Sequence, residues 1–166
     1  MMQDATVPWL LVLPAMVAWI GMTPELAAQN KPEKDVSLLL KNIADDLRQS
    51  GPLGWLPHFS TGPRFFMASD GKVVFANFDA AETFLKDFAT RVSHMEIRWS
   101  DVRVRMIGQD AALVAAAYDE TINQTSGKSK QFRGYFSGLA IRQQAGWKLG
   151  HLHWSSPRPD PDHPDQ

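Results

Sequence analysis

The stretch Trp147-Lys148-Leu149-Gly150-His151-Leu152-His153-Trp154-Ser155 decides the predicted fold, because it has the pattern of a β-strand. Side chains alternate between the two faces of a strand. One face therefore begins apolar and ends polar, as in a strand that runs from a core into a pocket, and it carries Trp147, Leu149, His151, His153 and Ser155. On the other face Leu152 and Trp154 need cover, which indicates a position within a sheet or at a contact between subunits.

The composition excludes several classes of function. The chain has 166 residues with 17 basic and 18 acidic side chains, a net charge of -1, so no excess of charge attracts nucleic acid or an anionic membrane. It has no cysteine, which excludes disulfides, thiolate nucleophiles and zinc sites built from cysteine. We predict no nucleic-acid partner, no metal and no cofactor.

An uninterrupted apolar run, VPWLLVLPAMVAWIGM, occupies residues 7–22. It is short for a membrane span, and small residues follow it as far as Ala28. This pattern predicts a signal peptide over residues 1–28 and a periplasmic or secreted protein that keeps no membrane span after cleavage. The segment before the run contains Asp4 and no basic residue, which is unusual for a signal peptide. A cytoplasmic protein that starts at Met22 and a retained membrane anchor are the alternatives.

Two helices and a hairpin are predicted before the long strands. Apolar residues recur at helical spacing over residues 34–50, where Asp35 is the expected N-cap. Residues 51–63, rich in glycine and proline, are predicted to form a loop or a short helical turn packed on the domain. Asp70-Gly71 between two short strand-like runs is a strong signal for a two-residue hairpin turn. Asp79 is predicted to open the second helix as the first residue of a capping box.

From His94 onward the hydrophobic pattern changes to a period of two. It predicts three long antiparallel strands before the closing one, over residues 95–107, 111–121 and 131–142. Helices gathered on one face of a curved antiparallel sheet form an α+β domain, and a strongly bent sheet with a helix across its mouth encloses a pocket. We predict one domain over residues 29–157 and a disordered acidic tail of Pro and Asp over residues 158–166.

Two segments carry a resemblance to a known family. They are Ser100–Val104 with the turn Gly108–Ala112 after it, and Gly146–Ser155. They resemble the third and closing strands of the SnoaL-like branch of the nuclear transport factor 2-like superfamily. This cystatin-like fold is shared with ketosteroid isomerase. The resemblance covers about residues 34–157 and implies a cone-shaped, strongly curved antiparallel sheet with helices on its concave face. The family commonly pairs through the sheet, which implies a homodimer through the outer face.

The family includes isomerases, polyketide cyclases, dehydratases, ligand-binding proteins and oligomerisation modules, so the fold alone does not select a function. Ketosteroid isomerase uses a carboxylate base near the first hairpin, with a tyrosine and a second acid as oxyanion donors. Here the first helix has no tyrosine, and the strand before the hairpin turn has no carboxylate. Asp70 falls in the turn itself, where its expected role is geometric. The catalytic residues of ketosteroid isomerase are therefore not matched.

Two histidines on the closing strand are candidates for a functional site. His151 and His153 would lie about 7 Å apart on one face. They could act as a proton shuttle or as metal ligands in the cavity, or be polar residues satisfied at the end of the sheet. His58 or a carboxylate could supply a third metal ligand, but no spacing requires it.

The preceding strands supply further candidates. Arg133 and Tyr135 share a face with Leu139 and Ile141, which are expected in the core, so both are predicted to contact a ligand nearer the mouth of the cavity. The alternative for Arg133 is a salt bridge to Asp119 or Glu120. Tyr118 and Glu120 share one face of their strand. An inward Glu120 would have a raised pKa and could act as an acid or base, whereas an exposed strand end would give neither property.

Three hypotheses of function follow. The first is a small exported domain whose conical pocket binds an apolar or aromatic molecule, with polar contacts that include Arg133, Tyr135, His151, His153, Tyr118 and His58. The second is an isomerase, cyclase or dehydratase in which a pocket acid or base, one of His151, His153 and Glu120, moves a proton. The third is a homo-oligomerisation module. A base and a donor near a common point would favour the enzyme, whereas an apolar cavity with a polar rim would favour binding.

Overall fold

A curved six-stranded sheet and two α-helices form most of residues 24–157, the part of the chain that the computed structural model describes, with side chains described from residue 31 onward. The elements are α1 (Pro24–Ser50), the 3-10 helix η1 (Gly51–His58), β1 (Phe66–Ser69), β2 (Lys72–Phe75), α2 (Phe78–Ala89), β3 (Val92–Met106), β4 (Ala111–Gln124), β5 (Ser129–Gln143) and β6 (Gly146–Ser155). The strands lie in the order β2-β1-β6-β5-β4-β3. All neighbours are antiparallel except β1 and β6, which run parallel. The predicted α+β class is confirmed.

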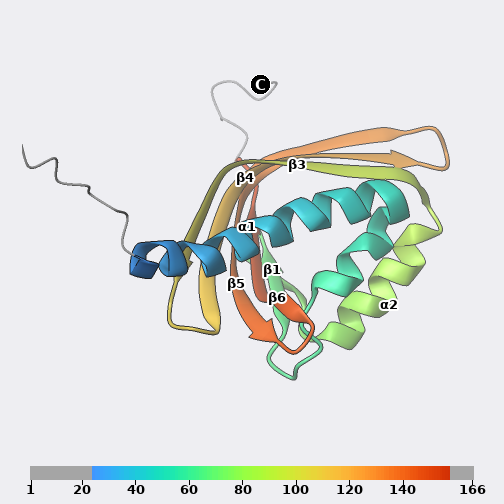
Figure 1. Ribbon diagram of the computed structural model, residues 1–166. Coiled ribbons are helices and arrows are strands. Elements are labelled where there is room, and N and C mark those ends of the chain that lie inside the picture. The colour runs from blue at the N-terminus through green and yellow to red at the C-terminus, as the bar shows by residue number, and fades with distance from the viewer. Residues whose placement is uncertain (1–23, 158–166) are drawn as a thin grey trace, which may run out of the picture.

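The helix α1 lies across the concave side of the sheet, where β3, β4 and β5 bend around it (Figure 1). Its predicted apolar stripe is buried and consists of Val36, Leu39, Leu40, Ile43 and Leu47. The helix begins at Pro24, a residue well suited to a first helical turn, so the prediction that Asp35 caps it was wrong. The predicted cleavage after Ala28 falls within α1, and the apolar run of residues 7–22 lies outside the described residues. Between residues 24 and 157, no helix is both long and apolar enough to cross a membrane.

The hairpin of β1 and β2 is followed directly by α2. The predicted turn Asp70-Gly71 is confirmed, with φ of 46° and 83°. The helix α2 begins before the predicted position, because Asn77 rather than Asp79 is its N-cap. The Asn77 side-chain oxygen accepts a hydrogen bond of 2.9 Å from the backbone N–H of Ala80, which satisfies one of the free donors of the first turn.

A β-bulge in β6 changes which side chains face the core. Leu139 pairs with His151, but the next residue of β5, Ala140, pairs with Leu149, so Gly150 is the additional residue. One additional residue reverses the alternation of side chains beyond it. Leu149 and Leu152 are therefore both fully buried on the concave side. Of the two predicted positions for this strand, the one within the sheet is confirmed, because β6 lies between β1 and β5, and Leu152 and Trp154 are covered within the chain. The prediction that His151 and His153 point inward was wrong.

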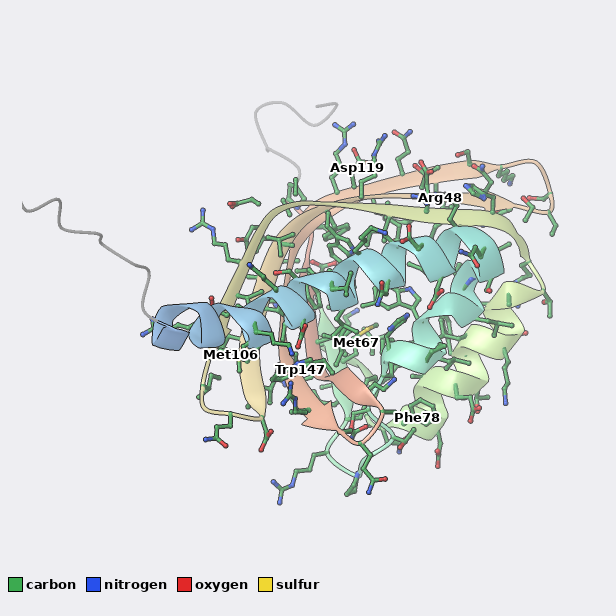
Figure 2. The ribbon with its side chains drawn as sticks, in the orientation of Figure 1. Arg48, Met67, Phe78, Met106, Asp119 and Trp147 are labelled. Atoms are coloured by element: carbon green, nitrogen blue, oxygen red, sulfur yellow. The ribbon has the colours of Figure 1, made fainter. Side chains whose placement is uncertain are left out.

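The strand β4 alternates without interruption and defines the two faces of the sheet. Its concave-side residues run from Ala112 through Val114 and Ala116 to Ile122 and are buried. Asp119, between two of these positions, points away from α1 on the outer side, whereas Met67 of β1 lies on the inner side (Figure 2). Residues paired across neighbouring strands share a face, so β4 assigns the faces of β5 as well.

Candidate functional site

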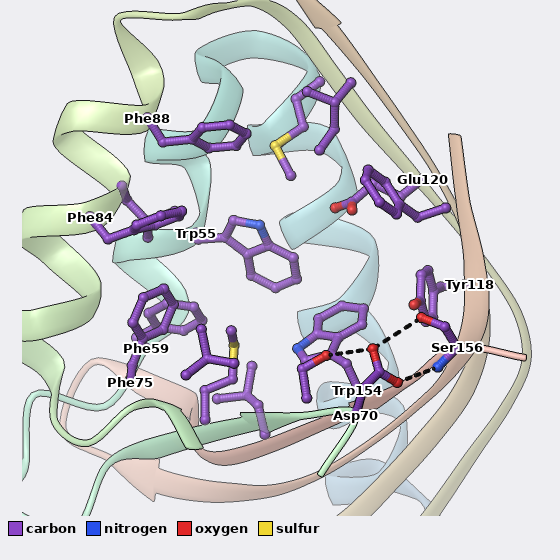
Figure 3. A pocket seen from close by; sticks show the side chains of 18 residues that line it. Trp55, Phe59, Asp70, Phe75, Phe84, Phe88, Tyr118, Glu120, Trp154 and Ser156 are labelled. Carbon is purple, nitrogen blue, oxygen red and sulfur yellow. Dashed lines mark hydrogen bonds between the residues drawn. The ribbon is translucent and has the colours of Figure 1, made fainter. Parts of the chain in front are cut away.

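A cavity of about 380 Å³ lies between the concave face of the sheet and the surface formed by η1 and α2 (Figure 3). Ligand pockets commonly measure from about 300 to about 1,000 Å³, so this one suits a small molecule. Its walls are mainly apolar, and eight of the 18 lining residues are aromatic, namely Trp55, Phe59, Phe75, Phe84, Phe88, Tyr118, Phe132 and Trp154. A pocket of this composition favours a flat or apolar ligand.

The rings are held in place by one another. Trp55 stacks on Phe59 with centroids 5.6 Å apart and meets Trp154 edge to face at 5.7 Å. On the opposite wall Phe84 stacks on Phe88 at 5.5 Å. Offset stacking and edge-to-face contacts are the favourable arrangements of aromatic pairs. These contacts fix the shape of the pocket before any ligand enters.

The 3-10 helix η1 is positioned by its contact with α1. A Cβ atom on Gly54 would lie 2.5 Å from the carbonyl carbon and oxygen of Asp46, so only glycine permits this approach. His58 Nε2 lies 2.7 Å from Asp46 Oδ2 and joins the same two elements. Burial lowers the pKa of His58, and the hydrogen bond to Asp46 opposes that shift. His58 is buried and does not line the cavity, so its predicted ligand contact is not formed here.

Glu120 brings a carboxyl group into the apolar pocket. Figure 3 shows its oxygens directed into the cavity, on the side facing Trp55. Burial raises the pKa of Glu120 to about 7, and it is the single cause of the shift. A carboxyl group in apolar surroundings retains its proton because the charged form loses its hydration. Near neutral pH Glu120 can therefore donate or accept a proton.

Tyr118 and Asp70 are the other ionisable residues of the pocket lining. Burial raises the pKa of Tyr118, a hydrogen bond with Ser156 opposes this, and the charges of Glu120 and Asp70 add to the rise. The Asp70 carboxylate accepts a hydrogen bond of 2.8 Å from the backbone N–H of Ser156, which is the main reason that its pKa is lowered. Asp70 thus serves both the turn and the pocket, whereas its sequence position had suggested only the turn.

The histidines of β6 lie on the convex face of the sheet, outside the pocket lining. The ring of His151 packs edge to face on Phe66, with centroids 3.9 Å apart, and burial together with the charge of His153 lowers its pKa. His153 pairs with Ser137 of β5 and Ala68 of β1. Neither histidine can act on a molecule in the cavity. In the described part of the chain, no cluster of three or more metal-ligating side chains occurs.

Arg133 and Tyr135 also lie on the convex face, so the prediction that they line the cavity was wrong. The inward residue between Tyr135 and Ser137 is the fully buried Phe136. The structure confirms the alternative that was left open for Arg133, because its Nε lies 3.3 Å from Asp119 Oδ2. The inference failed because it placed Leu139 in the core. The concave face of β5 instead alternates phenylalanine with small residues such as Gly134 and Gly138, where a Cβ atom would collide with the backbone of Ser155 and His151.

The mouth of the cavity was not predicted from the sequence. Val74, Phe84 and Phe132 line the cavity and remain partly exposed, by 45%, 44% and 40%. They come from β2 and α2, which follow one another in the chain, and from β5, which is distant from both in sequence. Of the predicted site residues, the structure brings only Tyr118 and Glu120 into one pocket.

Comparison with known proteins agrees with this architecture. The model of a family described as "SnoaL-like domain" matches residues 56–159. Among solved structures, a nuclear transport factor 2-like superfamily protein from Salmonella enterica has 15% identity and a TM-score of 0.66, with 78% of this chain and 94% of that chain covered. A candidate scytalone dehydratase from Novosphingobium aromaticivorans has 12% identity and a TM-score of 0.67, covering 82% and 89%.

A third solved structure is a candidate dehydratase of the same superfamily from Streptomyces avermitilis. It has 14% identity and a TM-score of 0.65, with 77% of this chain and 97% of that chain covered. At these identities the structural similarities establish the fold and leave the chemistry open. No curated protein matches the chain in sequence.

Proposed function

Because the chain belongs to the SnoaL-like domain family, we propose that it is a small exported domain whose pocket binds a small apolar or aromatic molecule. The observation that supports this proposal is the aromatic cavity of about 380 Å³ in which Glu120 has a pKa raised by burial alone. The walls would bury the flat part of the ligand. Glu120 and Tyr118 would then contact its polar atom and set its orientation.

Two adjacent residues of β2 allow a matched test with the neutral fluorescent probe N-phenylnaphthylamine. Val74 lines the mouth of the cavity, whereas Val73 is exposed and lies outside the lining. We expect the probe to bind the unaltered protein with enhanced fluorescence. Val74→Trp should weaken binding at least about tenfold by obstructing the mouth, and Val73→Trp should leave it unchanged. An unaltered protein that does not bind the probe, or equal effects of the two substitutions, would contradict the proposal.

An enzyme of the isomerase, cyclase or dehydratase type is the second candidate. The specific observation in its favour is that the pKa of Glu120 lies at about 7, where a carboxyl group exchanges protons efficiently at neutral pH. Glu120 would protonate a leaving hydroxyl or remove a proton next to a carbonyl, and Tyr118 would donate a hydrogen bond to the oxygen that gains charge. His151 and His153 have no part in this mechanism because they lie on the other face of the sheet.

Native mass spectrometry of protein purified from its own host would separate binding from turnover. In an enzyme, Glu120→Gln should retain a bound substrate, whereas the unaltered protein should hold a product that differs from it by a proton-transfer reaction, such as loss of water. In a binding protein both variants should hold the same molecule. Replacement of both His151 and His153 by glutamine should leave the bound species unchanged in either case.

Pairing of two copies through the convex face remains a proposal. Its first argument no longer applies, because Leu152 and Trp154 are covered within the chain. The convex face has other exposed apolar side chains, among them Leu113 at 51% and Tyr135 at 40%. Small side chains between them, such as Ala115 and Ala117, would permit a close approach of a second sheet.

Export remains a proposal that depends on the apolar run of residues 7–22. Cleavage after Ala28 would produce a mature chain that begins at Gln29. The intact mass of protein recovered from its own host tests this expectation. A mature chain that begins at Met1 or Met22 would refute it.

A further inference from the structure

The ionisable side chains that line the cavity are all acidic or phenolic. Asp70 and Glu120 supply carboxyl groups and Tyr118 supplies a hydroxyl, whereas none of the lining residues is lysine, arginine or histidine. This imbalance is local, because the whole chain has 17 basic and 18 acidic side chains. Arg133, next in sequence to Phe132 of the lining, lies on the convex face and pairs with Asp119 there. A ligand in the cavity therefore meets negative groups without a positive one.

The two carboxyl groups differ in state. Asp70 is held ionised by the backbone N–H of Ser156. Glu120 has no neighbouring charge that shifts its pKa, and burial alone sets it. A positive charge close to Glu120 would favour its ionised form, and a negative charge would oppose it. A cation that enters the site therefore forms an ion pair with Glu120, whereas an anion is repelled by the carboxylates.

The aromatic walls have the same preference as the carboxyl groups. The face of an indole or benzene ring attracts a cation within about 6 Å, and the attraction is larger where water is excluded. Figure 3 shows the Glu120 oxygens directed into the cavity on the side facing Trp55, with Phe84 and Phe88 farther away on the other side of the cavity. A cationic group in the cavity would lie close to the Glu120 carboxyl group and to several of the aromatic rings that line it. An anionic group at that position would contact neither favourably.

We propose that the pocket selects a molecule that carries a protonated nitrogen on an apolar or aromatic frame, an organic ammonium ion. This inference rests on the proposed function and specifies its ligand class. The frame occupies the aromatic walls, and the ammonium group donates hydrogen bonds to the Glu120 carboxylate. The protons balance on either route. A protonated amine releases the Glu120 proton to water, and a neutral amine takes that proton; both routes end in the same ion pair.

Three probes that share one frame test the ligand class: naphthylmethylamine, naphthylmethanol and naphthoic acid. They place a cation, a neutral hydroxyl and an anion on the same ring system. Calorimetric titration at pH 8 should show that the amine binds at least about tenfold more tightly than the alcohol, because hydrogen bonds to charged partners are about twice as strong as neutral ones. The acid should bind most weakly. Between pH 6 and pH 8 the affinity of the amine should rise about tenfold as Glu120 ionises, whereas that of the alcohol should not.

Two neighbouring acidic residues supply the variant and its control. Glu120→Gln keeps the shape of the side chain and should weaken amine binding about tenfold while leaving the alcohol within about twofold. Asp119→Asn removes the same charge from the convex face, where Asp119 pairs with Arg98 and Arg133, and should change neither affinity. A thermal unfolding transition in both variants confirms that they are folded.

The outcomes separate this inference from the function on which it rests. If the alcohol binds as tightly as the amine, or if the acid binds best, the preference for ammonium is refuted and a pocket for neutral or anionic molecules remains. If Glu120→Gln weakens the amine and the alcohol equally, Glu120 shapes the pocket without selecting charge, and the inference is again refuted. If none of the three probes binds, both the ligand class and the proposed function fail.

Discussion

Replacement of Glu120 by glutamine should change how the stability of the protein depends on pH. In the folded protein burial raises the pKa of Glu120 from 4.5 to about 7, whereas in the unfolded chain it is expected near its ordinary value. Between these two values the folded state holds a proton that the unfolded state has released. The free energy of unfolding therefore falls as the pH rises from about 4.5 to about 7. The glutamine variant has no such proton.

The size of the effect follows from the two pKa values. A tenfold difference in proton affinity equals about 1.4 kcal/mol, so the interval from 4.5 to about 7 corresponds to at most about 3.5 kcal/mol. The carboxyl group meets water in the open cavity, so we expect a measured value of about 1 to 3 kcal/mol. Below about pH 4 the two proteins should differ by a constant amount. Above about pH 8 the variant should have gained the full difference relative to the unaltered protein.

Urea denaturation at several pH values between 4 and 9 measures this difference. The useful quantity is the free energy of unfolding of Glu120→Gln minus that of the unaltered protein, because other titrating groups cancel in it. Asp119→Asn is the control, since its carboxylate is on the outer face beside two arginines, and its difference should not rise over this interval. A Glu120→Gln difference that stays constant from pH 5 to pH 8 would show that the carboxyl group is not desolvated, and the reasoning about the pocket would fail with it.

Three further substitutions test how the pocket is built. Gly54→Ala should lower stability by about 1 to 3 kcal/mol in urea denaturation, because its methyl group would collide with the Asp46 backbone, whereas Gly62→Ala should be nearly neutral; equal effects would contradict the close packing of η1 on α1. Asn77→Ala should cost about 1 kcal/mol by removing the cap of α2, and an unchanged urea midpoint would show that the cap is not formed. Leu113→Asp should convert a dimer into a monomer in light scattering if the convex face is the interface; a persisting dimer would place the interface elsewhere.

Much of the fold could be predicted because local patterns and the overall architecture agree. The apolar stripe of α1, the Asp70-Gly71 turn and the alternation of β4 each identify one element, and in the structure each element is present. The start of α1 was placed too late because the helix continues through Pro32, a residue type that usually interrupts a helix, and because Pro24 is compatible with its first turn. The ends of the helices and strands were less predictable than their central residues.

The closing strand shows why the candidate site was only partly predictable. Strict alternation puts Trp147 and Leu149 on one face and Leu152 and Trp154 on the other, so both faces require cover. One inserted residue resolves this conflict, because it brings all four side chains to the same face. The sequence did contain a signal, since an isolated glycine within a strand often marks a bulge or a close approach, and Gly150 lies midway between the two apolar pairs. The prediction of which side chains of β6 face the core should have been based on its four large apolar residues, rather than on the two histidines.

The position of Glu120 was predictable, but its chemical state was not. Alternation along β4 puts Glu120 on the same face as Val114 and Ala116, and the structure agrees. Whether that face is covered at the end of the strand depends on α2 and η1, which are distant in sequence and contribute the opposite wall. A carboxyl group on an uncovered strand end would have an ordinary pKa. The raised pKa of Glu120 is therefore a property of the tertiary structure. It exists because Gly54 and Asn77 help to position η1 and α2 over the end of β4, although neither helix is adjacent to β4 in the sequence.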